Sequence, residues 1–215
     1  MTIKSPIINI MTKAAYKAGN KLIKDFREVE NLQVSKKGVG DFVSTADLNS
    51  EETIIKELQK FYPNIDIIAE ETNPNINDNK SEKKFLVDPL DGTLNFLHGL
   101  PHFSISIALM YKEEIISGIV YDPIKDEMFW AEKGIGAFLN NSRIRVSSRN
   151  ELIEGLIATG IPWKGRTQKK HKKYSLLTRI GVYVSIICVR LIANDDVCRK
   201  FSCSRALRLS RCLFC

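Results

Sequence analysis

An apolar strand followed by a turn with two carboxylates is predicted in the stretch Phe85-Leu86-Val87-Asp88-Pro89-Leu90-Asp91-Gly92-Thr93-Leu94-Asn95-Phe96. Proline and glycine turn the chain between and after the aspartates, so both side chains and the Leu90 carbonyl can point at one place beyond the strand. Such an all-oxygen set of ligands is the kind that Mg²⁺ prefers. Gly92 and Thr93 then lie at a predicted helix start, where free N–H groups attract an anion. The stretch therefore predicts a metal site beside a phosphate-binding turn.

Two other segments carry carboxylates at the end or start of an element. Asp-Pro and Asp-Gly pairs are also common in ordinary loops, so the first stretch alone favours a plain turn. However, Glu70 and Glu71 follow a short apolar run at 65–69, and Asp47 lies at a predicted helix start. Three such segments together favour one shared site.

The remaining pattern predicts an α+β fold. Apolar residues recur at helical spacing over about 6–26 and 48–61, where Ser44, Thr45 and Asp47 offer N-cap oxygens to the second helix. Between these helices, residues 36–41 are rich in turn formers. Short apolar runs predict strands at 65–69, 85–87, 104–110, 115–121, 128–131 and 143–146. Because short turns join the later runs, we expect an antiparallel sheet with the helices packed on it.

Composition excludes several classes of protein. The chain has 215 residues, of which 44% are hydrophobic and 27% charged, unlike collagen, a coiled coil or a disordered chain. No apolar run approaches the roughly 18 residues of a membrane span. Residues 1–6 lack an apolar signal core. The expected location is therefore cytoplasmic, with no membrane partner.

The motif of the two aspartates resembles the first signature of the inositol monophosphatase family. Residues 87–98 match apolar-Asp-Pro-apolar-Asp-Gly-Thr-x-x-Phe-x-His without substitution, and four further family blocks match at 41–47, 69–72, 118–123 and 134–138. The resemblance runs from about residue 14 to 163 and is to the bacterial extragenic-suppressor (SuhB-type) branch. It implies a layered α/β sandwich of the inositol monophosphatase and sugar phosphatase type.

The resemblance also implies roles for individual residues. The ligands of Mg²⁺ are expected to be Glu70, Asp88, Leu90 through its carbonyl, and Asp91. The expected catalytic residues are Glu70, Thr93 and Asp47. Glu70 and Thr93 are expected to orient the attacking water, while Asp47 accepts a hydrogen bond from the Thr93 hydroxyl. The substrate phosphate is expected on Leu90, Asp91, Gly92 and Thr93, and a family lysine falls at Lys36 or Lys37.

The C-terminal part departs from the family pattern. The second family signature contains a Trp-Asp pair that supplies a further aspartate to a second Mg²⁺, but here Trp130 and Trp163 precede Ala131 and Lys164. All five cysteines fall in the last 28 residues, and seven basic but only two acidic residues follow residue 178. We therefore expect a truncated or frameshifted chain whose C-terminal layer is largely missing and whose activity is impaired.

Three regions follow from this interpretation. Residues 1–150 form a metal- and phosphate-binding α+β domain, residues 151–184 begin an incomplete C-terminal α/β domain, and residues 185–215 form an aberrant basic, cysteine-rich tail.

Three functions are consistent with the sequence. The first is a Mg²⁺-dependent phosphoric monoester hydrolase acting on inositol monophosphate or a similar small phosphorylated alcohol. The second is a nucleotide 3′-phosphatase or sugar bisphosphatase of the same superfamily. The third is a non-catalytic RNA- or transcription-associated binding protein. A nucleic-acid partner is not expected, since the only rings of the tail, Phe201 and Phe214, form no interleaved aromatic pattern. The resemblance also implies a homodimer.

Overall fold

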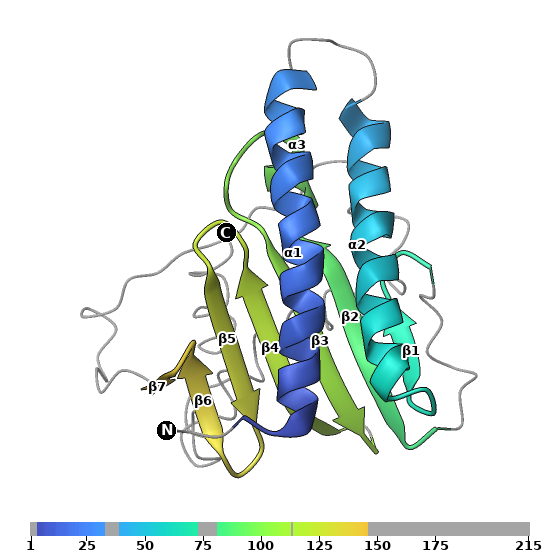
Figure 1. The fold of residues 1–215 in the computed structure, drawn as a ribbon, viewed down its shortest axis with the longest axis vertical. Helices are drawn as coiled ribbons and strands as arrows, with labels where there is room; N and C mark the ends of the chain where they lie inside the picture. Colours follow the sequence, from blue (N-terminus) through green and yellow to red (C-terminus); the bar gives the residue numbers. More distant parts are fainter. Residues whose placement is uncertain (1–3, 33–38, 73–80, 113, 146–215) are drawn as a thin grey trace, which may run out of the picture.

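The computed structural model describes residues 4–32, 39–72, 81–112 and 114–145, and these ranges form three helices and one seven-stranded sheet (Figure 1). The helices are α1 (Pro6–Leu32), α2 (Val39–Phe61) and α3 (Thr93–Leu97). The strands are β1 (Asp66–Ala69), β2 (Lys83–Asp91), β3 (Ser104–Tyr111), β4 (Glu114–Asp122), β5 (Glu127–Glu132), β6 (Gly136–Leu139) and β7 (Ser142–Ile144). The predicted regions 151–184 and 185–215 lie outside the described residues.

The strands lie in the sheet in the order in which they occur in the chain. Every pair from β2 to β7 is antiparallel, which confirms the predicted sheet. The prediction of an antiparallel sheet is wrong for the first pair, because β1 runs parallel to β2 with Ala69 opposite Val87. A parallel pair needs a connection of about a dozen residues or more, and residues 70–82 are long enough to return to the other end of the sheet.

Helix α1 begins as predicted and ends later. Pro6 takes the first helical position, where a missing N–H is harmless, and the Ser5 hydroxyl accepts a hydrogen bond from the Ile8 N–H at 3.4 Å. The predicted end near Phe26 lies six residues before the observed end at Leu32. Val29 is fully buried and continues the apolar spacing of Leu22 and Phe26, so the helix packs beyond the predicted boundary.

Helix α2 ends at the predicted residue but begins nine residues earlier than predicted. Its start at Val39 places residues 39–41 of the predicted turn in the helix, whereas residues 36–38 are not among those described. Ser44, Thr45 and Asp47 therefore lie inside the helix, and the prediction that they cap its N-terminus is wrong. The helix lies against α1 and β2, and such packing adds to the stability that local propensity gives a helix.

The predicted strands are found, with altered lengths. β2 continues to Asp91 instead of ending at Val87, and β7 ends at Ile144. Strand β6 was not predicted, because the glycines at 134 and 136 were interpreted as a turn. It pairs with β5 on one side and β7 on the other.

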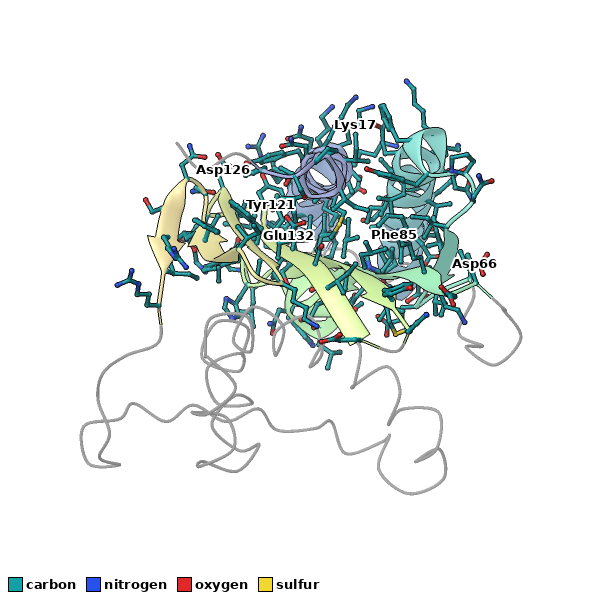
Figure 2. All side chains as sticks on the ribbon, turned by 90° about the horizontal axis from the view of Figure 1, so that it is seen from below. Lys17, Asp66, Phe85, Tyr121, Asp126 and Glu132 are labelled. Atoms are coloured by element: carbon teal, nitrogen blue, oxygen red, sulfur yellow. The ribbon has the colours of Figure 1, made fainter. Side chains whose placement is uncertain are left out.

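Both long helices cover one face of the sheet (Figure 2), with Phe85 and Tyr121 in the core between the layers. Helix α1 approaches β4 closely at Gly19, where a Cβ atom would lie 2.6 Å from a ring carbon of Tyr121. The opposite face of the sheet is also apolar, and its buried residues are Ile68, Leu86, Ala108, Val120, Ala131 and Ala137. None of the helices in the described ranges is long and apolar enough to cross a bilayer.

Candidate functional site

Two neighbouring strand ends place acidic side chains at one edge of the sheet. Since Ala69 of β1 and Val87 of β2 are paired in parallel, the residues that follow them, Glu70 and Asp88, lie next to each other at the same end of the sheet. The Glu70 N–H continues the pairing by donating to the Val87 carbonyl at 3.2 Å. Helix α2, which carries Asp47, packs on β2. Three segments distant in sequence therefore meet here (Figure 1).

A β-bulge places the two aspartates of β2 on the same face. Asp88 pairs with Ser106 and Asp91 with Ser104, so one extra residue of β2 lies between the two pairs. Ser104 and Ser106 are two residues apart on a regular strand and share a face, and each aspartate shares the face of its partner. The predicted turn between the aspartates is therefore wrong. Pro89 fits the bulge because a proline has no N–H to offer the ladder.

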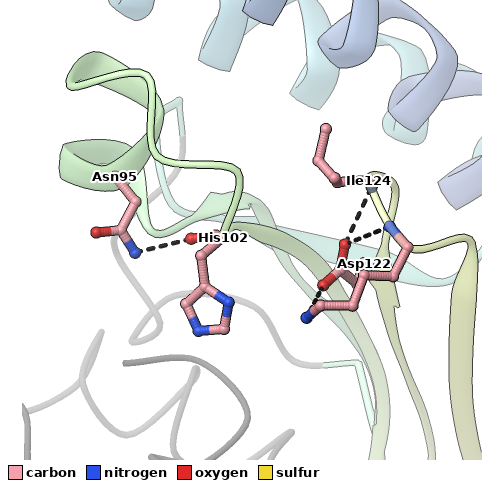
Figure 3. A network of polar contacts seen from close by, with 5 residues as sticks. Asn95, His102, Asp122 and Ile124 are labelled. Atoms are coloured by element: carbon pink, nitrogen blue, oxygen red, sulfur yellow. Dashed lines mark hydrogen bonds and ion pairs between the residues drawn. The ribbon is translucent and has the colours of Figure 1, made fainter.

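The predicted helix start after Asp91 is confirmed by α3, which begins at Thr93. Gly92 precedes it with φ of 94°, and a Cβ atom there would lie 3.0 Å from the His102 carbonyl oxygen. Only glycine meets both conditions without strain. The Asn95 side-chain amide donates to the same carbonyl at 2.7 Å, which fixes the loop after α3 (Figure 3).

The Thr93 hydroxyl makes a different hydrogen bond from the one implied by the resemblance. It donates to the Leu90 carbonyl oxygen at 3.0 Å, whereas the expected acceptor was Asp47. A hydroxyl has one proton, so this bond uses the proton that was assigned to Asp47. The Leu90 carbonyl, a predicted metal ligand, retains its second lone pair, and the hydroxyl oxygen keeps lone pairs of its own.

The four predicted carboxyls lie close enough to influence one another. Burial, followed by the charges of Glu71, Glu70 and Glu51, raises the pKa of Asp47 to about 8. Burial raises the pKa of Asp88 well above its usual value, and Asp91 and Glu70 raise it further. Glu70 has its pKa raised by burial and by neighbouring carboxylates, although a hydrogen bond with Asp88 opposes this. Burial raises the pKa of Asp91 to about 6, against the effect of the Gly92 N–H.

This electrostatic setting suits a divalent cation, since the charges that raise these pKa values are all carboxylates. The donors are exclusively oxygen atoms, as Mg²⁺ requires. As the side chains are placed, no group of three or more His, Cys, Asp or Glu residues in the described ranges is arranged to hold one metal ion. The chemistry of the donor set fits Mg²⁺, and the roles of the individual ligands stay predictions.

We expect the stability of the metal-free chain to fall as the pH rises towards 8. Asp47 has a raised pKa in the folded chain, so folding takes up a proton between pH about 4 and about 8. The contribution is complete below pH about 4 and is lost as the pH passes the folded value, at up to about 1.4 kcal/mol per pH unit. Urea unfolding in EDTA across this range measures it. Asp47→Asn should flatten the slope, and parallel slopes for the two proteins would contradict the prediction.

Two buried residues of α2 were not predicted to belong to the site. Ser50 and Glu51 are fully buried and contact the two acid-bearing strand ends. The sequence did contain a signal, because polar residues 47, 50 and 51 lie on the same helical face as the apolar Ile54 and Leu58. The family lysine expected at Lys36 or Lys37 is outside the described ranges, and His98, the last residue of the matched motif, is exposed.

Comparison with known proteins agrees with this architecture. The model of the Inositol monophosphatase family matches residues 3–192, which passes the boundary at 184 expected from the sequence. An inositol-1-monophosphatase of Rhizobium meliloti is 47% identical over 171 residues, covering 80% of this chain and 63% of the relative. The Nus factor SuhB of Haemophilus influenzae is 44% identical over 160 residues, covering 74% and 60%.

The chain is also similar to a solved structure. The extragenic suppressor protein suhB from Bartonella henselae is 50% identical, with a TM-score of 0.59, over 67% of this chain and 56% of that chain. The chain thus spans less than two thirds of the length of the relatives that it matches.

Proposed function

Because the chain belongs to the inositol monophosphatase family, we propose that it is a Mg²⁺-dependent phosphoric monoester hydrolase. Its proposed substrate is inositol monophosphate or a similar small phosphorylated alcohol. The observation that carries the proposal is the meeting of Asp47, Glu70, Asp88 and Asp91, whose pKa values are all raised. Perturbed carboxyls gathered from distant segments are typical of functional sites.

In this proposal, Mg²⁺ is held by Glu70, Asp88, the Leu90 carbonyl and Asp91. When bound, the cation supplies Lewis acidity, lowering the pKa of water and offsetting charge on the phosphate oxygens. Because the Thr93 hydroxyl donates to Leu90, its lone pairs are available to accept a hydrogen bond from the attacking water. A carboxylate oxygen of Glu70 accepts the second proton of that water and fixes its direction of attack.

The substrate phosphate is proposed to lie on the segment from Leu90 to Thr93. The first N–H groups of a helix have no acceptor within the helix, and no side chain caps the N-terminus of α3. Gly92 lets the backbone turn sharply enough to present these groups beside Asp91. Since the Thr93 hydroxyl donates to Leu90, Asp47 is proposed to act by its charge beside Asp88 when a cation is bound at the site.

We expect phosphate release that depends on Mg²⁺, because the donor set of the site consists of carboxylate and carbonyl oxygens. Release of inorganic phosphate from inositol 1-phosphate, with Mg²⁺ or with EDTA, measures this. Release that persists in EDTA would overturn the proposal, and so would the absence of both release and Mg²⁺ binding. Parallel assays with a nucleoside 3′-phosphate and a sugar bisphosphate distinguish the substrate classes.

A second candidate function is a non-catalytic one. It is favoured by the similarity to the Nus factor SuhB of Haemophilus influenzae, which is 44% identical over 160 residues. Under this alternative the chain acts in transcription by binding a partner, and neutralising the acidic site leaves that binding unchanged. Retention on immobilised RNA by wild-type and Asp88→Asn protein, at two salt concentrations, distinguishes it from the hydrolase.

We also propose that the chain forms a homodimer. Its mass in solution, measured by analytical ultracentrifugation, tests this.

A further inference from the structure

Two consecutive residues of α2 each bind one of the two strand ends that carry the acidic side chains. Ser50 and Glu51 are both fully buried, and neither belongs to the predicted ligands. We propose that they are positioning residues, through which α2 fixes the separation of Glu70 and Asp88 and so sets the affinity of the site for Mg²⁺. The inference rests on the proposed function and deepens it.

Glu51 binds the backbone that directly follows Glu70. One carboxylate oxygen accepts from the Glu71 N–H at 2.8 Å, and the other accepts from the Thr72 N–H at 3.0 Å. The Thr72 hydroxyl donates to that second oxygen as well. A buried charge is unfavourable unless it is hydrogen-bonded. All three groups that donate to the Glu51 carboxylate belong to the two residues that follow Glu70. The position of Glu70 is thereby tied to α2.

Ser50 binds the bulge that separates Asp88 from Asp91. Its hydroxyl donates to the Pro89 carbonyl oxygen at 2.9 Å, across 39 positions of sequence. A bulge interrupts the regular ladder, so the backbone there relies on partners outside the sheet. The Ser50 hydroxyl is such a partner. It ties the backbone between the two aspartates of β2 to the same turn of α2 that holds the loop after β1.

The two anchors act as a pair because they are adjacent on a rigid helix, while β1 and β2 are adjacent in the sheet. Their separation along α2 is fixed by helical geometry, so neither segment can move away from α2 without breaking a hydrogen bond to it. Glu51 also brings a further carboxylate close to Glu70, which adds to the negative charge that a bound cation would meet at this end of the sheet.

The test compares Glu51→Gln and Ser50→Ala with the wild-type full chain. The glutamine places an N–H₂ group where an acceptor is needed, and the alanine removes the donor to Pro89. Calorimetry is expected to show Mg²⁺ affinity reduced by about 10-fold or more in each, as for other residues that orient metal ligands. Hydrogen exchange of the Glu71 and Thr72 amides is expected to accelerate in Glu51→Gln.

Glu57→Gln is the matched control, since Glu57 is another α2 carboxylate but pairs with Lys13 and Lys17 of α1. It should lower the melting temperature and leave the Mg²⁺ affinity unchanged. Unchanged affinity in folded Glu51→Gln and Ser50→Ala overturns the inference, and Ser50→Ala alone decides if the glutamine variant does not fold. Failure of the wild-type chain to bind Mg²⁺ instead overturns the proposed function, and the inference with it.

Discussion

A chain with Asp88→Asn is expected to lose its stabilisation by Mg²⁺ altogether. A ligand present at 100 times its Kd stabilises a folded protein by about 2.7 kcal/mol, and the wild-type chain should show a shift of this size. Asparagine keeps an oxygen that can accept the Leu90 N–H, now bound by Asp88 at 3.3 Å, but it removes a charged ligand. Thermal unfolding with MgCl₂, and with NaCl at equal ionic strength, measures the difference.

The same variant should be more stable than the wild-type chain when both are free of metal. Burial and the charges of Asp91 and Glu70 raise the pKa of Asp88 in the folded chain, which means that its ionised form is unfavourable there without a cation. Asparagine carries no charge and avoids this unfavourable contribution. A variant that still responds to Mg²⁺, or that is less stable than wild type in EDTA, would count against the site.

Asp122→Asn provides the matched control. Asp122 is also a buried aspartate at the end of a strand, but it accepts from the Ile124 and Lys125 N–H groups at 3.0 Å each and pairs with the Lys125 ammonium at 2.8 Å (Figure 3). Its replacement breaks a satisfied network, so the chain should lose stability and keep its response to Mg²⁺. Opposite effects of the two substitutions would separate the acidic site from ordinary buried aspartates.

Phe96→Ala is expected to lower the free energy of unfolding by about 3–5 kcal/mol, the usual loss for a fully buried phenylalanine. Phe96 is the only buried residue of α3 and contacts two other rings, with centroids 5.4 Å from Phe26 and 4.9 Å from Phe103. It thereby anchors the helix that follows Gly92. Urea unfolding measures the change, and loosening of the turn should also weaken Mg²⁺ binding.

Leu94→Ala is the control for this substitution, because Leu94 lies on the same helix but is 46% exposed. Surface truncations of this kind usually change stability by no more than about 0.5 kcal/mol. Equal effects of the two substitutions would show that α3 is not anchored through Phe96.

Local patterns predicted the elements whose ends are marked by the sequence itself. The predicted strand at 104–110 is observed as Ser104–Tyr111, and the second helix ends before Tyr62 and Pro63 as expected. Elements that depend on distant partners were missed or misplaced. β6 is bounded by glycines that resemble a turn, yet it is held by two neighbouring strands. The start of α2 was also misplaced, since it lies nine residues before the predicted one.

The candidate site was likewise predicted where its signal is local and missed where it depends on residues distant in sequence. The carboxylates were found because each stands at or next to the end or start of a predicted local element, and the resemblance then related them to one another. The parallel pairing of β1 with β2 and the bulge at Pro89 were not predictable, since both depend on the register between strands. Ser50 and Glu51 were missed because their partners lie 39 and 20 residues away.

The agreement between strand order and chain order has a consequence for synthesis. Each strand can pair with its predecessor as soon as it leaves the ribosome, so the contact order of the sheet is low and its growth should be rapid. Helix α1 is made first and can pack on α2 soon afterwards, but β3, β4 and β5, on which it also rests, emerge about a hundred residues after α1 begins. The part of its apolar stripe that faces the sheet therefore stays uncovered throughout that interval.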